Sequence, residues 1–185
     1  MGGGRASLTG DEGGGPAGIE TARLRLRRWR AEDAPALEAI LGDPKVMRFS
    51  DDGPLGPQAR AAWLRAALAE AGRPAPLGAW AITRKPEAAA VGYLKLAEDG
   101  RIGPNDVELG VRLALSAQGR GFASEAARAA VEALAASVPS VRLVAVVDPG
   151  NLASVRLMAR LGLVRERDVM FEGYDHPDHL YVAPS

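Results

Sequence analysis

Hydrophobic and polar residues alternate along the first foldable stretch of the chain. Over residues 21–29 the apolar Leu24 and Leu26 alternate with arginines. This period of two predicts a strand with one buried face. Residues 1–18 are rich in glycine and offer almost nothing to bury, so we expect a disordered tail there and a single folded domain over 19–185.

Two helices are expected after this strand. Ala31 to Leu41 has acidic residues in its first turn and apolar residues behind them, and a turn at Gly42 follows it. The second helix begins at Pro57, because proline suits the first helical position, and it ends before Gly72. Its apolar stripe predicts that one face packs on the sheet.

Apolar runs separated by turn residues predict most of the remaining elements. The expected elements are strands at 78–84, 90–96 and 107–115, a helix at 122–137, a strand at 141–147, a helix at 153–161, and strands at 164–171 and 179–182. The spacing of the first three favours an antiparallel meander, followed by one β-loop-α-β crossover. The predicted fold class is therefore α+β, with a mixed, mostly antiparallel central sheet flanked by helices.

Composition narrows the choice of partner and compartment. The 23 basic side chains balance 23 acidic ones, so no net field favours nucleic acid. Cysteine is absent, which excludes disulfides and thiolate chemistry and suits the cytoplasm, our expected location. No stretch approaches the roughly 18 apolar residues of a spanning helix, so we expect no membrane partner.

A glycine-rich loop, Ser116 to Ser124, joins an apolar strand to an amphipathic helix. Gly119 and Gly121 let a ligand approach the backbone closely, and amides at a helix N-terminus suit a phosphate. A tight strand-helix turn is the plain alternative. A Rossmann nucleotide site is a second one, but the third glycine is missing and antiparallel-looking strands precede the loop.

The segment from Gln118 to Ala123 resembles the Gln/Arg-x-x-Gly-x-Gly/Ala signature of the GNAT superfamily of N-acetyltransferases. The segment from Asn151 to Leu163 is similar to the Asn-x-x-Ser stretch that follows the next strand in that family. Residues 20–27, 107–111 and 178–181 further resemble the branch that acetylates ribosomal-protein N-termini (RimJ/RimL-type). The resemblance covers nearly the whole foldable region.

The resemblance implies an N-acetyltransferase that moves acetyl from acetyl-CoA to a protein N-terminus or a small-molecule amine. It implies that backbone groups at Val111 and Leu113 hold the pantetheine arm and that amides from Gly119 to Ser124 hold the pyrophosphate. The implied acetyl-CoA-binding residues are Val111, Leu113, Gln118, Gly119, Arg120, Gly121, Phe122, Ala123, Ser124 and Asn151. A homodimer is left open.

Glu108, Asn151 and Ser154 are the candidate catalytic residues. Glu108 points away from the apolar face of its strand, as a general base or as a solvated polar residue. Ser154 lies one helical turn after Asn151 and either assists the leaving thiolate or caps the helix. Many relatives carry a tyrosine acid where this chain has Met158, which cannot donate a proton. A catalytically degenerate CoA-binding sensor therefore remains an alternative.

His176 and His179 stand beside Asp175 and Asp178 near the C-terminus. No helix aligns the two histidines, and the sequence shows no clear further ligand. We therefore expect no metal site, and a wall of the substrate site or a closing strand instead.

Overall fold

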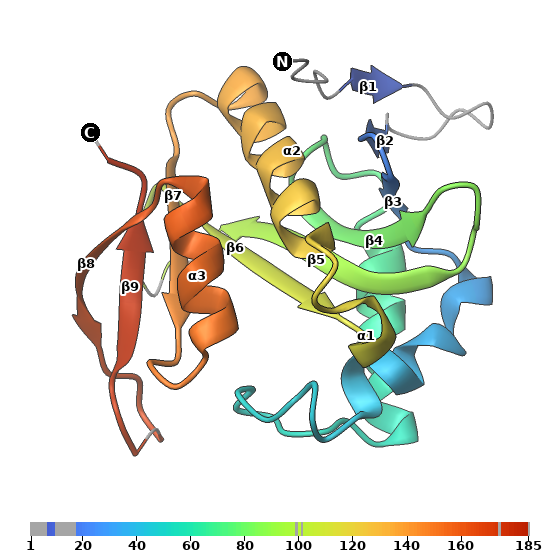
Figure 1. Ribbon diagram of the computed structural model, residues 1–185, viewed down its shortest axis with the longest axis horizontal. Helices are drawn as coiled ribbons and strands as arrows, with labels where there is room; N and C mark the ends of the chain where they lie inside the picture. Colours follow the sequence, from blue (N-terminus) through green and yellow to red (C-terminus); the bar gives the residue numbers. More distant parts are fainter. Residues whose placement is uncertain (1–6, 10–17, 99, 101, 174, 185) are drawn as a thin grey trace.

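One sheet runs through the molecule, whose computed structural model describes residues 7–9, 18–98, 100, 102–173 and 175–184. Over these residues the sheet has nine strands in the order β1-β2-β3-β4-β5-β6-β7-β9-β8, and β6–β7 is its one parallel pair. Figure 1 shows the arrangement. The strands are β1 Ser7–Thr9, β2 Gly18–Glu20, β3 Leu24–Arg28, β4 Gly78–Arg84, β5 Ala90–Glu98, β6 Asp106–Leu113, β7 Arg142–Val147, β8 Val164–Val169 and β9 Asp178–Val182.

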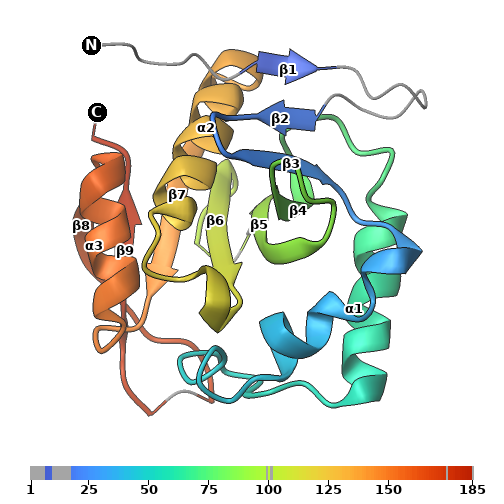
Figure 2. The same ribbon diagram turned by 45° about the vertical axis from the view of Figure 1, so that its right-hand side comes forward.

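Helices cover both faces of the sheet (Figures 1 and 2). The helices α2 (Phe122–Ser137) and α3 (Leu152–Leu161) pack on one face, and α1 (Pro57–Ala69) packs on the other. Successive side chains of β4 point to opposite faces of the sheet. Trp80 and Ile82 pack on the side of α2, and Ala79 and Ala81 pack on the side of α1. The predicted α+β class with a mostly antiparallel sheet is confirmed, and this topology excludes a doubly wound Rossmann fold.

The helix predicted over residues 31–41 is broken into two short pieces. A 3₁₀ turn, η1, spans Ala31–Asp33, and a π-helical turn, η2, spans Glu38–Gly42. The buried Asp33 carboxylate accepts from the Arg30 N–H at 2.9 Å and from both terminal nitrogens of Arg27 at 2.7 Å. These bonds fix a tight first turn, and Pro35 has no N–H with which to continue it as an α-helix. The periodicity showed the buried face of this segment but not these constraints.

The predicted first strand is one arm of a hairpin. It begins at Leu24, because Thr21 forms the turn from β2 and its Oγ accepts from the Leu24 N–H at 2.9 Å. In the tail that we expected to be disordered, Ser7–Thr9 form β1, whose backbone pairs with the edge of β2. Pairing covers an otherwise open sheet edge. Residues 1–6 and 10–17 of that tail lie outside the described residues.

No helix among the described residues is both long enough and apolar enough to span a bilayer. The cytoplasmic location stays a prediction.

Candidate active site

The parallel strands β6 and β7 pair only at their starts. The paired residues run from Asp106 with Arg142 to Glu108 with Val144. Beyond Glu108, β6 continues against β5, whereas β7 continues against β9. The two strands therefore diverge, and a V-shaped gap opens in the sheet (Figure 1).

The backbone of β6 presents polar groups to this gap. After β6, the Ala114 N–H donates to Val91 of β5 at 2.9 Å, and before β6, the Asn105 carbonyl accepts from Arg142 of β7 at 2.9 Å. Alternate residues of a strand face opposite neighbours. The residues whose N–H and C=O groups face the diverging β7 are therefore Leu109, Val111 and Leu113.

The glycine loop ends at the mouth of the same gap. Gly119 has φ of 73° and Gly121 has φ of 78°, a left-handed conformation that a side chain disfavours. Gly121 is the N-cap residue of α2, so the first N–H groups of the helix have no intrahelical acceptor. These amides carry the positive end of the helix dipole, which suits an anion.

A cleft of about 1090 Å³ joins these features. The gap between β6 and β7, the N-termini of α2 and α3, and the segment before α1 all contribute to its walls. It brings together every candidate residue of the sequence analysis except Arg120. The predicted residues that line it are Glu108, Val111, Leu113, Gln118, Gly119, Gly121, Phe122, Ala123, Ser124, Asn151 and Ser154.

Gln118 and Arg120 hold the loop in shape. The Gln118 side-chain amide donates to the Leu113 carbonyl at 2.9 Å, which ties the loop to the end of β6. The Arg120 carbonyl accepts from the Arg23 guanidinium at 3.1 Å. Leu113 therefore offers its N–H toward the gap, while its carbonyl already has a donor.

Glu125, in the first turn of α2, fastens the helix to the β2–β3 turn. Its carboxylate accepts from the Thr21 hydroxyl at 2.6 Å, the Arg23 N–H at 2.9 Å and the Arg23 Nε at 2.7 Å. Burial alone would raise the pKa of Glu125, but these hydrogen bonds outweigh it and lower the pKa below its ordinary value. The ionised carboxylate thus contributes to the position of the glycine loop.

We expect Glu125→Gln to destabilise the fold by about 1–2 kcal/mol at pH 7, since charge-assisted bonds are lost. Because the folded pKa is depressed, this stabilisation is present above the unfolded pKa of about 4.3 and is lost as the pH falls through the folded value. Urea unfolding of both proteins from pH 7 to pH 3 measures it, and the two curves should converge at the acid end. A constant difference across that range would show that the carboxylate charge is not what stabilises the clamp.

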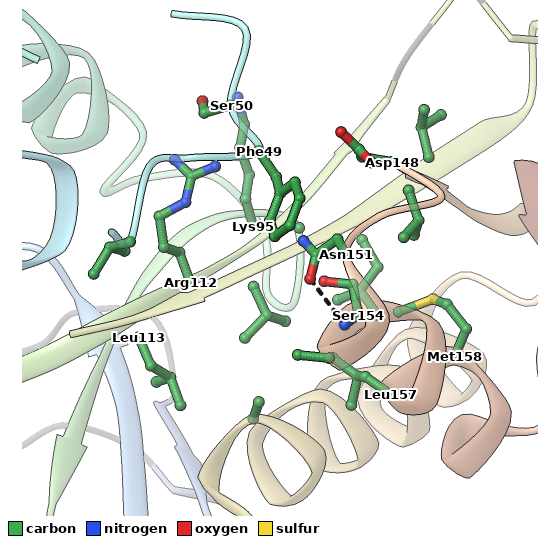
Figure 3. Close-up of a pocket in the computed structure, with 18 of the residues that line it drawn as sticks. Phe49, Ser50, Lys95, Arg112, Leu113, Asp148, Asn151, Ser154, Leu157 and Met158 are labelled. Atoms are coloured by element: carbon green, nitrogen blue, oxygen red, sulfur yellow. Dashed lines mark hydrogen bonds between the residues drawn. The ribbon is translucent and has the colours of Figure 1, made fainter. Parts of the chain in front are cut away.

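Asn151 caps α3, and Ser154 donates to that cap through its backbone. The Asn151 side-chain oxygen accepts from the Ser154 N–H at 3.2 Å (Figure 3). The side-chain cap that was considered for Ser154 is therefore made by Asn151. The Ser154 hydroxyl is on the cleft wall and does not form this cap.

The other side of the cleft lies on the face of β5 and β6 opposite α2. Glu108, Arg112, Tyr93 and Lys95 line it, as expected from alternation along the two strands. Burial raises the pKa of Tyr93, and the charge of Glu108 adds to the shift, so the phenol stays neutral near pH 7. In Figure 3 the Phe49 ring lies between Arg112 and Asn151.

The end of the cleft next to β7 and β9 is acidic. Asp148, at the end of β7, and Asp178, at the start of β9, both line it. Burial raises the pKa of Asp178, and repulsion from Asp148 and Asp51 raises it further. Phe49 packs against the same turn, because a Cβ on Gly150 would lie 3.4 Å from its ring.

Sequence reasoning missed several residues that the cleft contains. Phe49 lies in an irregular segment with no periodic signal, and Asp148 merely follows a predicted strand. Lys95 and Arg112 could have been found, because both occupy the polar face of a predicted strand. Met158, by contrast, was predicted to depart from the pattern of the family that the sequence resembles, and it lies in the cleft wall with 3% exposure.

The model of the "Acetyltransferase (GNAT) domain" family matches residues 23–164. An uncharacterised N-acetyltransferase of Bacillus subtilis, YnaD, is 25% identical over 168 residues, covering 89% of this chain and 95% of the relative. A GNAT-family acetyltransferase of Bacillus anthracis has a TM-score of 0.75 at 21% identity, covering 89% of this chain and 96% of that one.

The solved structure of RimL, an α-N-protein acetyltransferase of ribosomal L7/L12 in complex with coenzyme A, has a TM-score of 0.72 at 20% identity. It covers 88% of this chain and 94% of its own. The match of the family model over most of the chain defines an acetyltransferase. The chain belongs to the GNAT family, as the match over most of its length shows, and it is an N-acetyltransferase.

Proposed function

We propose that this protein transfers the acetyl group of acetyl-CoA directly to a primary amine bound in the same cleft. The observation that carries the proposal is the convergence of two backbone features on one cleft. One is the edge of β6 at Leu109, Val111 and Leu113, and the other is the N-terminus of α2 behind Gly121.

The two features suit the two halves of the cosubstrate. The pantetheine arm carries amides that can pair with the edge of β6 as an added strand would. The pyrophosphate can accept from the N–H groups of residues 119–124. Each helix-terminus charge interaction contributes about 0.3–1 kcal/mol, whereas micromolar binding needs about 8 kcal/mol, so both halves must contribute.

Glu108 is the proposed general base. Its side chain lies on the cleft wall that β5 and β6 form on the face opposite α2. We place the approach of the acceptor on that side. A neutral amine attacks the thioester carbonyl, the carbon–sulfur bond breaks, and coenzyme A leaves as a thiolate. The amine loses one proton, which Glu108 accepts directly or through water.

The thiolate takes up a proton from another group. Met158 has no proton to give, although it stands where many relatives carry tyrosine. We assign this step to the Ser154 hydroxyl, or to a water held between Ser154 and Asn151. The proposed transfer forms no covalent acetyl-enzyme, because the sequence has no cysteine and no Ser-His-acid set is apparent among the described residues.

The acceptor is either a protein N-terminus or a small-molecule amine. The fold shared with RimL supports the first, and the charged groups of the cleft are compatible with both. A degenerate CoA-binding sensor is the alternative that Met158 keeps open. Release of free coenzyme A thiol should be measured against a panel of peptides, polyamines and amino sugars. Tight acetyl-CoA binding without amine-dependent thiol release from any member would favour the sensor.

Two alanine variants separate the cap of α3 from the chemistry. Asn151→Ala should cost about 1 kcal/mol of stability, because the Ser154 N–H loses its acceptor. Ser154→Ala keeps that N–H, so stability should change by only a few tenths of a kcal/mol while turnover falls about tenfold. Thermal unfolding and steady-state kinetics measure the two effects. Full turnover in Ser154→Ala would remove its hydroxyl from the proposed proton path.

A further inference from the structure

Three side chains meet at the acidic end of the cleft. They are Asp148 at the end of β7, His176 in the β8–β9 connection and Asp178 at the start of β9. The His176 Nε2 lies 3.3 Å from Asp148 Oδ2 and 4.0 Å from Asp178 Oδ1, and one ligand atom from each residue lies within 4.8 Å of the others. The sequence showed no clear further ligand beside the two histidines and their neighbouring aspartates, and the fold brings in Asp148, which lies 28 residues before His176.

Neighbouring groups hold two of these side chains in orientation. The His176 Nδ1 lies 2.6 Å from Asp175 Oδ1, so the ring donates its Nδ1–H there and directs Nε2 toward the two carboxylates. Asp148 Oδ1 accepts from the Gly150 N–H at 2.6 Å, which leaves Oδ2 facing the ring. A carboxylate behind a histidine is the usual outer support of a metal ligand.

The environment of Asp178 is a second observation that suits a bound cation. The residue is 9% exposed and its carboxylate lines the cleft. Within the described residues no donor hydrogen-bonds to this carboxylate, and the nearest basic nitrogen is that of His176 at 4.0 Å. The β7–β9 register also places Asp148 opposite Asp178, because Val147 pairs with His179. Two carboxylates so placed repel each other, and a cation between them would relieve that repulsion.

We propose that Asp148, His176 and Asp178 bind one divalent first-row transition-metal ion. Imidazole nitrogen with two carboxylates suits Zn²⁺ or Mn²⁺, whereas Mg²⁺ favours oxygen ligands alone. Two carboxylates also balance the charge of the ion. Ligand atoms about 2.1 Å from a tetrahedral Zn²⁺ lie about 3.4 Å apart, so the Asp148–His176 pair already fits. The other two pairs must close, from 4.0 Å for His176–Asp178 and from at most 4.8 Å for Asp148–Asp178, which takes small movements of the His176 ring and of the two carboxylates.

Asp148 and Asp178 line the same cleft as the proposed acetyl-transfer site, but metal binding does not depend on acetyl transfer. The ion would offset the negative charge of Asp178 and of Asp148 on the cleft wall, the latter three residues before Asn151, and it would tie the β8–β9 connection to the end of β7. Binding can therefore be measured on the protein without acetyl-CoA.

The test is calorimetric titration of the full chain, prepared without a histidine tag, with ZnCl₂, MnCl₂ and MgCl₂. The chain has two histidines and no cysteine, so His179→Gln is the matched control. We expect one Zn²⁺ per chain, at least tenfold weaker binding in His176→Gln and in Asp178→Asn, and affinity within twofold of wild type in His179→Gln. Asp175→Asn should weaken binding about tenfold, as loss of an outer support does.

Three results would overturn the proposal. They are no saturable heat up to millimolar metal, unchanged affinity in His176→Gln, and an equal loss in His179→Gln. If Asp178→Asn fails to fold, His176→Gln still decides the question, because that side chain lies at the surface and half of it is exposed.

Discussion

Gly121→Asp should raise the dissociation constant for acetyl-CoA at least 100-fold. The new carboxylate would stand at the N-terminus of α2, where the proposed pyrophosphate site lies. Two unit charges about 4 Å apart repel by about 4 kcal/mol at an effective dielectric constant of 20, and a 100-fold loss needs only about 2.7 kcal/mol. The nearest atom to a Cβ at this position is Arg23 Nη2 at 3.5 Å, so the side chain fits sterically. Calorimetric titration with acetyl-CoA measures the change.

Gly162→Asp is the matched control for backbone strain. Gly162 has the same φ of 78°, caps the other end of α3, and has open space where a Cβ would stand. In both variants aspartate must adopt a left-handed backbone conformation, which costs about 1–2 kcal/mol of stability. Only Gly121→Asp also adds a charge to the cleft. Equal losses of acetyl-CoA affinity in the two variants, or none in Gly121→Asp, would refute the loop assignment.

The glycine loop and the antiparallel meander of β4, β5 and β6 were readable from the sequence because both depend on local rules. Gly119 and Gly121 fall between a strand period and a helix period, and the structure gives both the positive φ that glycine permits. The same rules fail over residues 31–41. There the Arg27 side chain, on β3, binds the Asp33 carboxylate, and the hydrophobic pattern of a sequence cannot predict such a polar contact.

The cleft itself depends on long-range register. The pairing of β6 with β7 ends at Glu108 and β9 inserts between β7 and β8, and no local motif encodes either feature. The grouping of Asp148 with His176 and Asp178 has the same origin, since it requires β9 to lie beside β7. Sequence reasoning found the histidine and one aspartate but could not bring the second aspartate to them.

Glu108→Gln should lower kcat/KM at pH 7 by about 100-fold for a lysine-like acceptor and by about tenfold or less for a peptide N-terminus. An amine with a pKa near 10.4 is neutral about once in 2,500 molecules at pH 7, a handicap of about 4.6 kcal/mol. An α-amine with a pKa near 8 pays about 1.4 kcal/mol and depends far less on a base. Glutamine keeps the shape of the side chain but cannot accept the proton, so acetyl-CoA affinity should stay within about twofold.

The pH dependence distinguishes a base from a binding group. At pH 9 an α-amine is mostly neutral, so its penalty in Glu108→Gln should largely vanish, whereas a lysine-like amine should still show a loss. Glu98→Gln is the control, because Glu98 also lines the cleft but pairs at 2.7 Å with Arg73, which lies in the loop between α1 and β4. It should leave the profiles of both acceptors unchanged. Equal losses in Glu108→Gln for both acceptors at both pH values would mean that Glu108 orients the amine without taking its proton, and the base would then be an ordered water or another group of the cleft.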